Sequence, residues 1–101
     1  MKTFQPGSFL ALAQIDPTSA LACASGDMEM AARMAGAAVG MSETMKFTRE
    51  PVDEQFIRPW VDRMRQALGH DAFEAAFAAG RQLEWRAALQ EAQTWLLSSR
   101  P

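Results

Sequence analysis

Residues that favour β-strands are scarce in this chain, and their scarcity limits the folds that it can adopt. Isoleucine and valine occur only at Ile15, Val39, Val52, Ile57 and Val61, whereas alanine is the commonest residue and 49% of the chain is hydrophobic. Strands are rich in β-branched and aromatic side chains, while alanine has the highest helix propensity. The sequence therefore predicts an all-α protein.

Glycine and proline divide the chain into about five helices, which we expect to pack as antiparallel helix pairs in one domain over residues 1–101. The expected helices cover residues 8–24, 27–44, 51–68, 70–80 and 85–97, and residues 1–7 are a candidate loose segment. Gly26 followed by Asp27 predicts a left-handed C-cap and then an N-cap. Gly69 and Gly80 are expected to end the third and fourth helices in the same way.

Two prolines fall inside these stretches and leave alternatives open. Pro17 follows Asp16, which is the usual order of an N-cap and a first helical residue, so the first stretch is either interrupted there or divided into two helices. Pro59 removes one helical hydrogen bond, so it either kinks the third helix or marks its true start.

The second helix is predicted to be apolar on two sides. One stripe consists of Met30, Met34, Ala37, Met41 and Met45, and a second consists of Met28, Ala32, Ala35 and Val39. A helix with two apolar stripes is expected to be sandwiched between neighbours. Ala31, Ala35, Gly36 and Gly40 are small enough to let another helix backbone approach closely.

Two further stripes are expected to be buried. In the third helix the stripe is Phe56, Trp60, Met64 and Leu68, widened by Ile57 and Val61. In the last helix it is Trp85, Ala88, Leu89, Ala92, Trp95 and Leu96. Leu83, just before the last helix, is placed to pack on Ala88 as a hydrophobic staple.

Charge and cysteine content bear on partners and location. The net charge is −2 and the pI about 5.3, with the basic residues scattered, so we expect no direct binding to nucleic acid. The single cysteine, Cys23, excludes a disulfide framework and suits a reducing cytoplasm. No apolar run reaches the roughly 18–20 residues that a membrane span needs.

The residues that could carry chemistry do not form a recognisable motif, and we expect no enzyme. His70 is the only histidine, and a zinc or iron site needs three or four converging ligands. Cys23 would need a base beside it to act as a nucleophile, and it is expected to be a buried small residue instead. We therefore predict no catalytic residue, no metal site and no cofactor.

Two blocks of the chain resemble a known family. The first is Gly-Asp-Met-Glu-Met-Ala-Ala-Arg-Met-Ala-Gly-Ala-Ala at residues 26–38, and the second runs from Leu68-Gly69 through Phe73, Ala76 and Gly80-Arg81 to Leu83 and Ala88. In this order they resemble the C-terminal tetratricopeptide-like helical-repeat region of large bacterial LuxR-type or ATPase-linked transcriptional regulators. The similarity covers residues 26–92.

The resemblance implies a repeat scaffold that senses ligands or partners and holds the other domains of a regulator. The chain departs from the family in having no phosphate-binding Gly-rich loop and in stopping near the point where a helix-turn-helix would begin. The capping box of the last helix is also lost, because Glu84 and Ala87 stand at its two positions.

These observations predict a non-catalytic protein-interaction module, a detached sensor or scaffold part of a regulator. A short helical repeat cannot bury both of its end faces, so we expect a homodimer. The expected partner-binding residues are Trp85, Leu89, Trp95 and Leu96. The alternative is a small-molecule binding domain with an apolar pocket lined by methionine and tryptophan.

Overall fold

The fold consists of helices throughout the part of the chain that can be described. The computed structural model describes residues 6–44 and 51–98, with side chains for residues 14–44 and 55–98. These residues form five helices and no strand, which confirms the predicted class: α1 (Pro6–Ser25), α2 (Met28–Thr44), α3 (Pro51–Leu68), α4 (His70–Arg81) and α5 (Trp85–Ser98). Within these ranges, none of the helices is both long and apolar enough to pass through a bilayer. Met45 and residues 1–5 of the candidate loose segment lie outside them.

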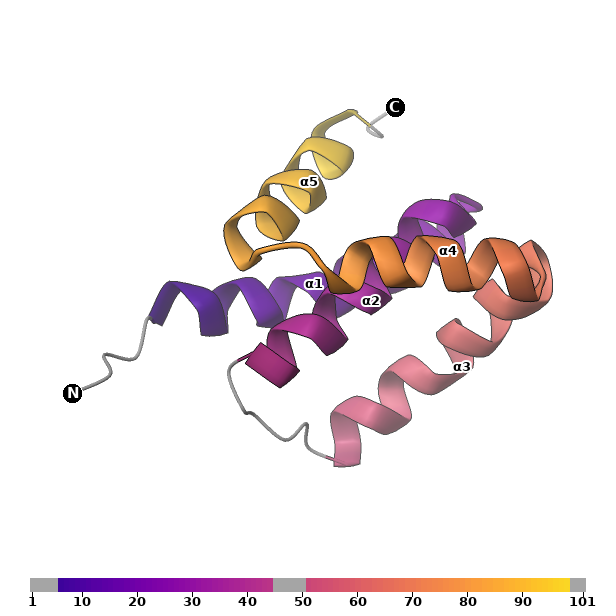
Figure 1. The fold of residues 1–101 in the computed structure, drawn as a ribbon, viewed down its shortest axis with the longest axis horizontal. Coiled ribbons are helices and arrows are strands. Elements are labelled where there is room, and N and C mark those ends of the chain that lie inside the picture. Colours follow the sequence, from indigo (N-terminus) through magenta and orange to yellow (C-terminus); the bar gives the residue numbers. More distant parts are fainter. Residues whose placement is uncertain (1–5, 45–50, 99–101) are drawn as a thin grey trace.

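Helix α2 lies at the centre of the arrangement and packs most extensively on α4 and α1 (Figure 1). Its two predicted stripes enter two different core clusters. Met34, Ala37 and Met41 pack with Ile15 of α1 and with Ala88 and Ala92 of α5. Ala32 and Ala35 pack with Ala22 and Cys23 of α1, Met64 of α3 and Phe73 of α4. The prediction of a sandwiched helix is therefore confirmed.

Helices α2 and α4 cross with their backbones nearly in contact. A Cβ atom added to Gly36 would lie 2.8 Å from the carbonyl carbon of Phe77, and one added to Gly40 would lie 3.0 Å from that of Arg81. From the other side, a Cβ on Gly80 would lie 2.7 Å from the carbonyl carbon of Arg33. Real Cβ atoms do not approach a backbone so closely, so the crossing requires glycine on both helices.

Gly80 corrects one sequence-based expectation. It does not end α4, which continues to Arg81, and the glycines with positive φ in the described residues are Gly26 (93°) and Gly69 (83°). Gly26 and Asp27 have the predicted roles, because the Met30 amide donates to Asp27 Oδ1 at 3.2 Å. Gly80 serves close packing instead, and a single sequence cannot distinguish that role from a C-cap.

Both prolines lie inside continuous helices. Helix α1 runs through Pro17 and α3 runs through Pro59, so neither proline starts a helix. Both residues are exposed. Because the carbonyl that loses its partner lies on the same side of the helix as the proline, water can bind it. Next to Pro17, the Thr18 hydroxyl donates to the carbonyl of Gln14 at 2.8 Å.

The buried stripe of α3 differs from the expected one at Phe56. This side chain is 49% exposed, whereas Ile57 and Met64 are buried and Trp60 and Leu68 are half-buried. The stripe thus begins at Ile57, seven residues before Met64, and this shift turns Phe56 outward. Periodicity alone fits either register, because the two residues are adjacent and both apolar.

Helix α5 returns to the first half of the chain. It packs mainly on α1 and to a smaller extent on α2, and it buries Ala88 and Ala92 there. Leu83 packs against the same cluster, in agreement with the expected staple. Since α5 closes the bundle on α1 in place of extending a stack beyond α3 and α4, the tetratricopeptide-like pairing is not confirmed (Figure 1).

The close crossing predicts that Gly80→Ala destabilises the protein. Helix propensity alone would make alanine more favourable by about 1 kcal/mol. The collision with the Arg33 carbonyl should outweigh this gain and lower the free energy of unfolding by about 1–3 kcal/mol, the usual range for overpacking. Urea unfolding measures the change. Ala78→Gly, at an exposed position of the same helix, measures the difference in helix propensity between alanine and glycine without a collision. A stabilised Gly80→Ala protein would contradict the close crossing.

Candidate protein-interaction surfaces

Helices α4 and α5 diverge from the loop that joins them (Figure 1). A groove is lined by residues of both helices and of the start of α2. It consists of two adjoining hollows, of about 440 and 470 Å³, which share Met30 and Trp95 in their walls. The α4 wall is Ala72, Ala75, Ala76 and Ala79, and the start of α2 contributes Asp27, Glu29, Met30 and Arg33. The α5 wall is Ala87, Gln90, Glu91, Thr94, Trp95 and Ser98. We call this surface the α4–α5 groove.

Trp95 is held in the groove by the residue that caps α2. Its indole Nε1 donates to Asp27 Oδ2 at 2.8 Å, while Asp27 Oδ1 accepts the amide of Met30. The ring is half-buried and packs against the second core cluster. One carboxylate therefore fixes both the beginning of α2 and the orientation of an aromatic side chain near the end of α5.

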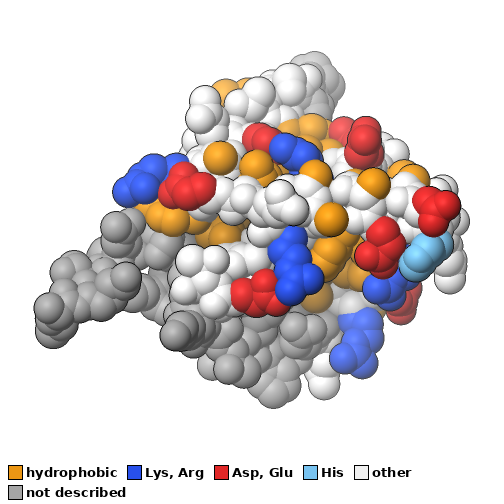
Figure 2. All heavy atoms as spheres, in the orientation of Figure 1, with side chains coloured by type: hydrophobic (Ala, Val, Ile, Leu, Met, Phe, Trp, Pro, Cys, Tyr) orange, Lys and Arg blue, Asp and Glu red, His pale blue; other side chains and the backbone are white. Residues whose placement is uncertain are grey.

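An ion pair joins α2 to α5 beside the same groove. Arg33 Nε and Nη2 donate to the two carboxylate oxygens of Glu91 at 2.6 and 2.7 Å. The two side chains are 33% and 35% exposed. The hydrogen bonds from Arg33 hold the pKa of Glu91 below its ordinary value, although partial burial acts in the opposite direction. Figure 2 shows acidic and basic side chains next to hydrophobic ones on this face of the molecule.

A second surface lies on the other flank of α5. A hollow of about 330 Å³ is lined by Gln14, Pro17, Thr18, Leu21 and Leu96, none of which is charged. Leu21 is 50% exposed, and Leu97, which follows Leu96 on α5, is 69% exposed. We call the hollow together with Leu97 the α1–α5 face.

The four expected partner-binding residues are distributed over different environments. Trp85 and Leu89 are half-buried against the first core cluster, and the Arg86 guanidinium lies over the Trp85 ring at 4.5 Å from its centre. Trp95 lines the α4–α5 groove, and Leu96 lines the α1–α5 face. The structure therefore does not bring the four together as one exposed patch.

Sequence reasoning missed the two leucines that are most exposed among the described residues. Leu97 lies outside the buried stripe of α5. Its position off the helical repeat could have indicated from the sequence that this leucine faces outward. Leu21 gave no such signal, because it lies in an apolar run whose other members include the buried Ala20, Ala22 and Cys23.

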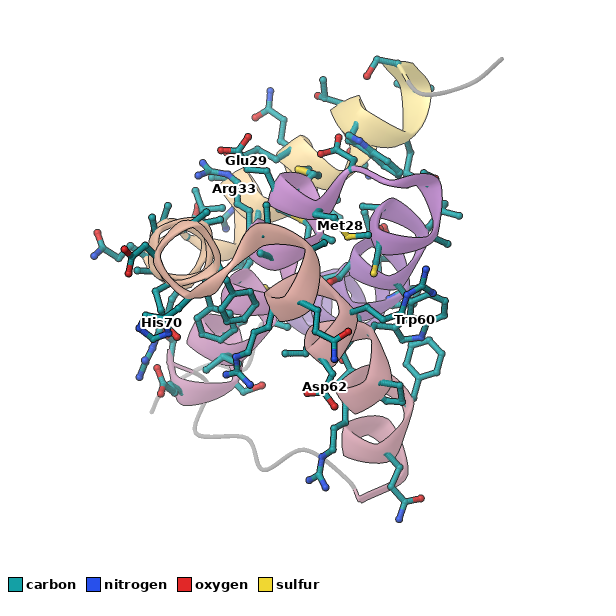
Figure 3. All side chains as sticks on the ribbon, turned by 90° about the vertical axis from the view of Figure 1, so that its right-hand side faces the viewer. Met28, Glu29, Arg33, Trp60, Asp62 and His70 are labelled. Atoms are coloured by element: carbon teal, nitrogen blue, oxygen red, sulfur yellow. The ribbon has the colours of Figure 1, made fainter. Side chains whose placement is uncertain are left out.

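The residues considered for chemistry lie in different parts of the molecule. Cys23 is buried, with its Sγ 3.7 Å from the carbonyl oxygen of Trp60, as expected for a small core residue. His70 is exposed at the start of α4, and Figure 3 shows it apart from both Trp60 and the Glu29–Arg33 region. Within the described ranges, no group of three or more His, Cys, Asp or Glu side chains could hold a metal ion.

The shared role of Asp27 predicts energetic coupling between the N-cap of α2 and the Trp95 side chain of α5. Asp27→Ala should cost about 1–2 kcal/mol because it removes the cap, and Trp95→Phe about 0.5–1.5 kcal/mol because it removes a hydrogen bond. In the double variant the total loss should be smaller than the sum of the two single losses, because both substitutions remove the same bond. Urea unfolding of the unmutated protein, the two single variants and the double variant measures these losses. Strictly additive losses would contradict the hydrogen bond.

The Arg33–Glu91 pair predicts a pH-dependent contribution to stability. A carboxylate with a lowered pKa stabilises the folded state above its ordinary pKa of about 4.3, and the contribution is lost as the pH falls through the folded-state value. At pH 7, Glu91→Gln should cost no more than about 1 kcal/mol, because the pair is partly exposed and screened. Urea unfolding at pH 7 and pH 3 should show the difference from the unmutated protein becoming smaller at acid pH. A difference as large at pH 3 as at pH 7 would contradict the ion pair.

Comparisons with known proteins add nothing to this geometry. No protein-family model, curated protein or solved structure matches the chain at a significant level.

Proposed function

We propose that this chain is a non-catalytic protein-interaction module that forms a homodimer through the α1–α5 face. The observation that carries the proposal is the exposure of Leu21, which lines an uncharged hollow, and of Leu97, which follows the lining residue Leu96 on α5. Large apolar side chains gathered on one surface are typical of a site that another protein covers. The sequence resemblance supports a role as the scaffold or sensor part of a bacterial regulator, and the free thiol of Cys23 supports a cytoplasmic location.

The α1–α5 face suits contact with a second copy of itself. Leu21 and Leu96 line its hollow, and the exposed Leu97 follows Leu96 on α5, so two copies related by a two-fold axis can each bring exposed leucines to the other. No described residue lining the hollow is charged, so the two copies bring no like charges together there. The expectation of dimerisation through α5 is thus kept, with Leu97 and Leu21 in place of Trp85, Leu89 and Trp95.

The expected dimer is weak. Complete burial of a leucine contributes about 1.5–3 kcal/mol, and Leu21 and Leu97 are already partly covered in the monomer. Their burial in two copies gives an amount comparable with the lower estimates of the cost of association, about 4 kcal/mol. We therefore expect monomer and dimer to exchange as the protein is diluted.

The homodimer predicts that Leu97→Gln and Leu21→Gln each shift the equilibrium to monomer while the helix content stays unchanged. Phe56→Gln is the matched control, since it removes an apolar side chain that is about as exposed as Leu21 and lies outside the α1–α5 face. Sedimentation equilibrium from low to high micromolar concentration measures the mass. An unmutated protein that is monomeric over this range, or a Phe56→Gln variant that loses the dimer, would refute the proposed interface.

A small-molecule binding domain is a second candidate function. The observation that favours it is that Met30 and Trp95 line both hollows of the α4–α5 groove. Thermal-shift screening against small apolar compounds tests it, because a specific ligand raises the melting temperature by mass action. A compound that stabilises the unmutated protein and loses its effect in Met30→Ala would support this candidate, whereas a flat screen favours the interaction module.

A further inference from the structure

We propose that the α4–α5 groove binds one amphipathic helix of a different protein, which carries a narrow apolar stripe flanked by lysine or arginine. This partner is separate from the second copy in the proposed homodimer, which uses the α1–α5 face. Shape, rigidity and charge of the groove each contribute to the argument.

The shape of the groove suits a helix. Ala72, Ala75 and Ala79 are exposed along one side of α4, and Ala76 is half-buried beside them. Walls made of methyl groups let the backbone of an incoming helix come close, as the glycines do where α4 crosses α2. At 1.5 Å per residue, the α4 wall from Ala72 to Ala79 is about 10 Å long and the α5 wall from Ala87 to Ser98 about 16 Å. These lengths correspond to two to three helical turns.

The apolar centre of the groove is already arranged for contact. Met30 and Trp95 belong to both hollows, so an apolar stripe lying along the groove would meet them at its middle. The hydrogen bond to Asp27 fixes the Trp95 ring before any partner arrives, which reduces the entropy lost on binding. Met30 is flexible and can adapt to side chains of different shape.

The charges of the groove favour a basic partner. Asp27, Glu29 and Glu91 contribute three carboxylates, and Arg33 contributes the only positive side chain among the described residues that line it. Arg33 is bonded to Glu91 in a two-pronged pair, so Asp27 and Glu29 remain as excess negative charge. The start of α2 offsets part of this, but a helix N-terminus corresponds to only about half a positive charge. Lysine or arginine beside the apolar stripe would neutralise the remainder.

A displayed library of helical peptides tests the proposal. The probe is a designed helix of about four turns, randomised on one apolar stripe and at the positions that flank it, and selected on the unmutated protein. We expect the selected sequences to be enriched in lysine and arginine at the flanking positions and in small or medium apolar residues in the stripe. Selected peptides are then synthesised, and their affinity is measured by fluorescence anisotropy.

Two exposed alanines on different sides of α4 provide a matched pair of variants. Ala79→Arg fills the groove and should weaken binding by about ten-fold or more, whereas Ala78→Arg adds the same side chain outside the groove and should change it by less than about two-fold. Circular dichroism checks that both fold. If Ala79→Arg does not fold, Ala75→Gln blocks the same wall without adding charge.

Two exposed glutamates, one inside and one outside the groove, provide a second matched pair of variants. Glu29→Gln should weaken binding several-fold at low salt and less at high salt, because screening shortens the reach of the carboxylate. Glu74→Gln removes an exposed acid that does not line the groove and should have little effect.

Several outcomes would overturn the proposal. One is a selection that yields no binder, or binders without enrichment in basic residues. Another is equal binding by the Ala79→Arg and Ala78→Arg proteins. A third is a loss of self-association in Ala79→Arg, which would make a second copy the occupant of the groove. Because the dimer is tested by Leu97→Gln and Leu21→Gln, either proposal can fail without the other.

Discussion

The close approach of the α2 and α4 backbones is the constraint on which the rest of the arrangement depends. Gly36 and Gly40 on α2 and Gly80 on α4 let the two helices approach until a single added methyl group would collide with a carbonyl. Glycine has no side chain to pack, but here the two backbones pack directly on each other and supply the van der Waals attraction instead. With α4 set so close on one side, α2 can use its remaining surface for α1 and α5.

This central position divides the core into two parts. Methionines of α2 face Ile15 and the alanines of α5, while alanines of α2 face Cys23, Met64 and Phe73. Alanine is small enough for the places where backbones meet, and methionine is flexible enough to fill the space where α5 approaches. These two needs explain why both residue types dominate α2. The same division leaves α4 and α5 on different sides of the first turns of α2, and the groove is the space between them.

Much of the fold could be predicted from the sequence because local signals were strong. The glycine and aspartate at positions 26 and 27, the two stripes of α2 and the alanines of α5 all have the predicted roles. The errors arose where one residue type fits two environments: Gly80 as a cap or a packing site, and Phe56 or Ile57 as the start of a stripe. The candidate surfaces were harder, because the Asp27–Trp95 and Arg33–Glu91 hydrogen bonds join residues 68 and 58 positions apart.

Because Cys23 is buried, the accessibility of its thiol to reagents measures local opening of the bundle. Its sulfur lies between the backbone of α3, at Trp60, and the core cluster beneath α2, and the chain contains no other thiol. An alkylating reagent can reach it only when α1 separates from the helices that pack on it. The rate of modification under native conditions therefore reports the free energy of that local opening, independently of the unfolding of the whole molecule.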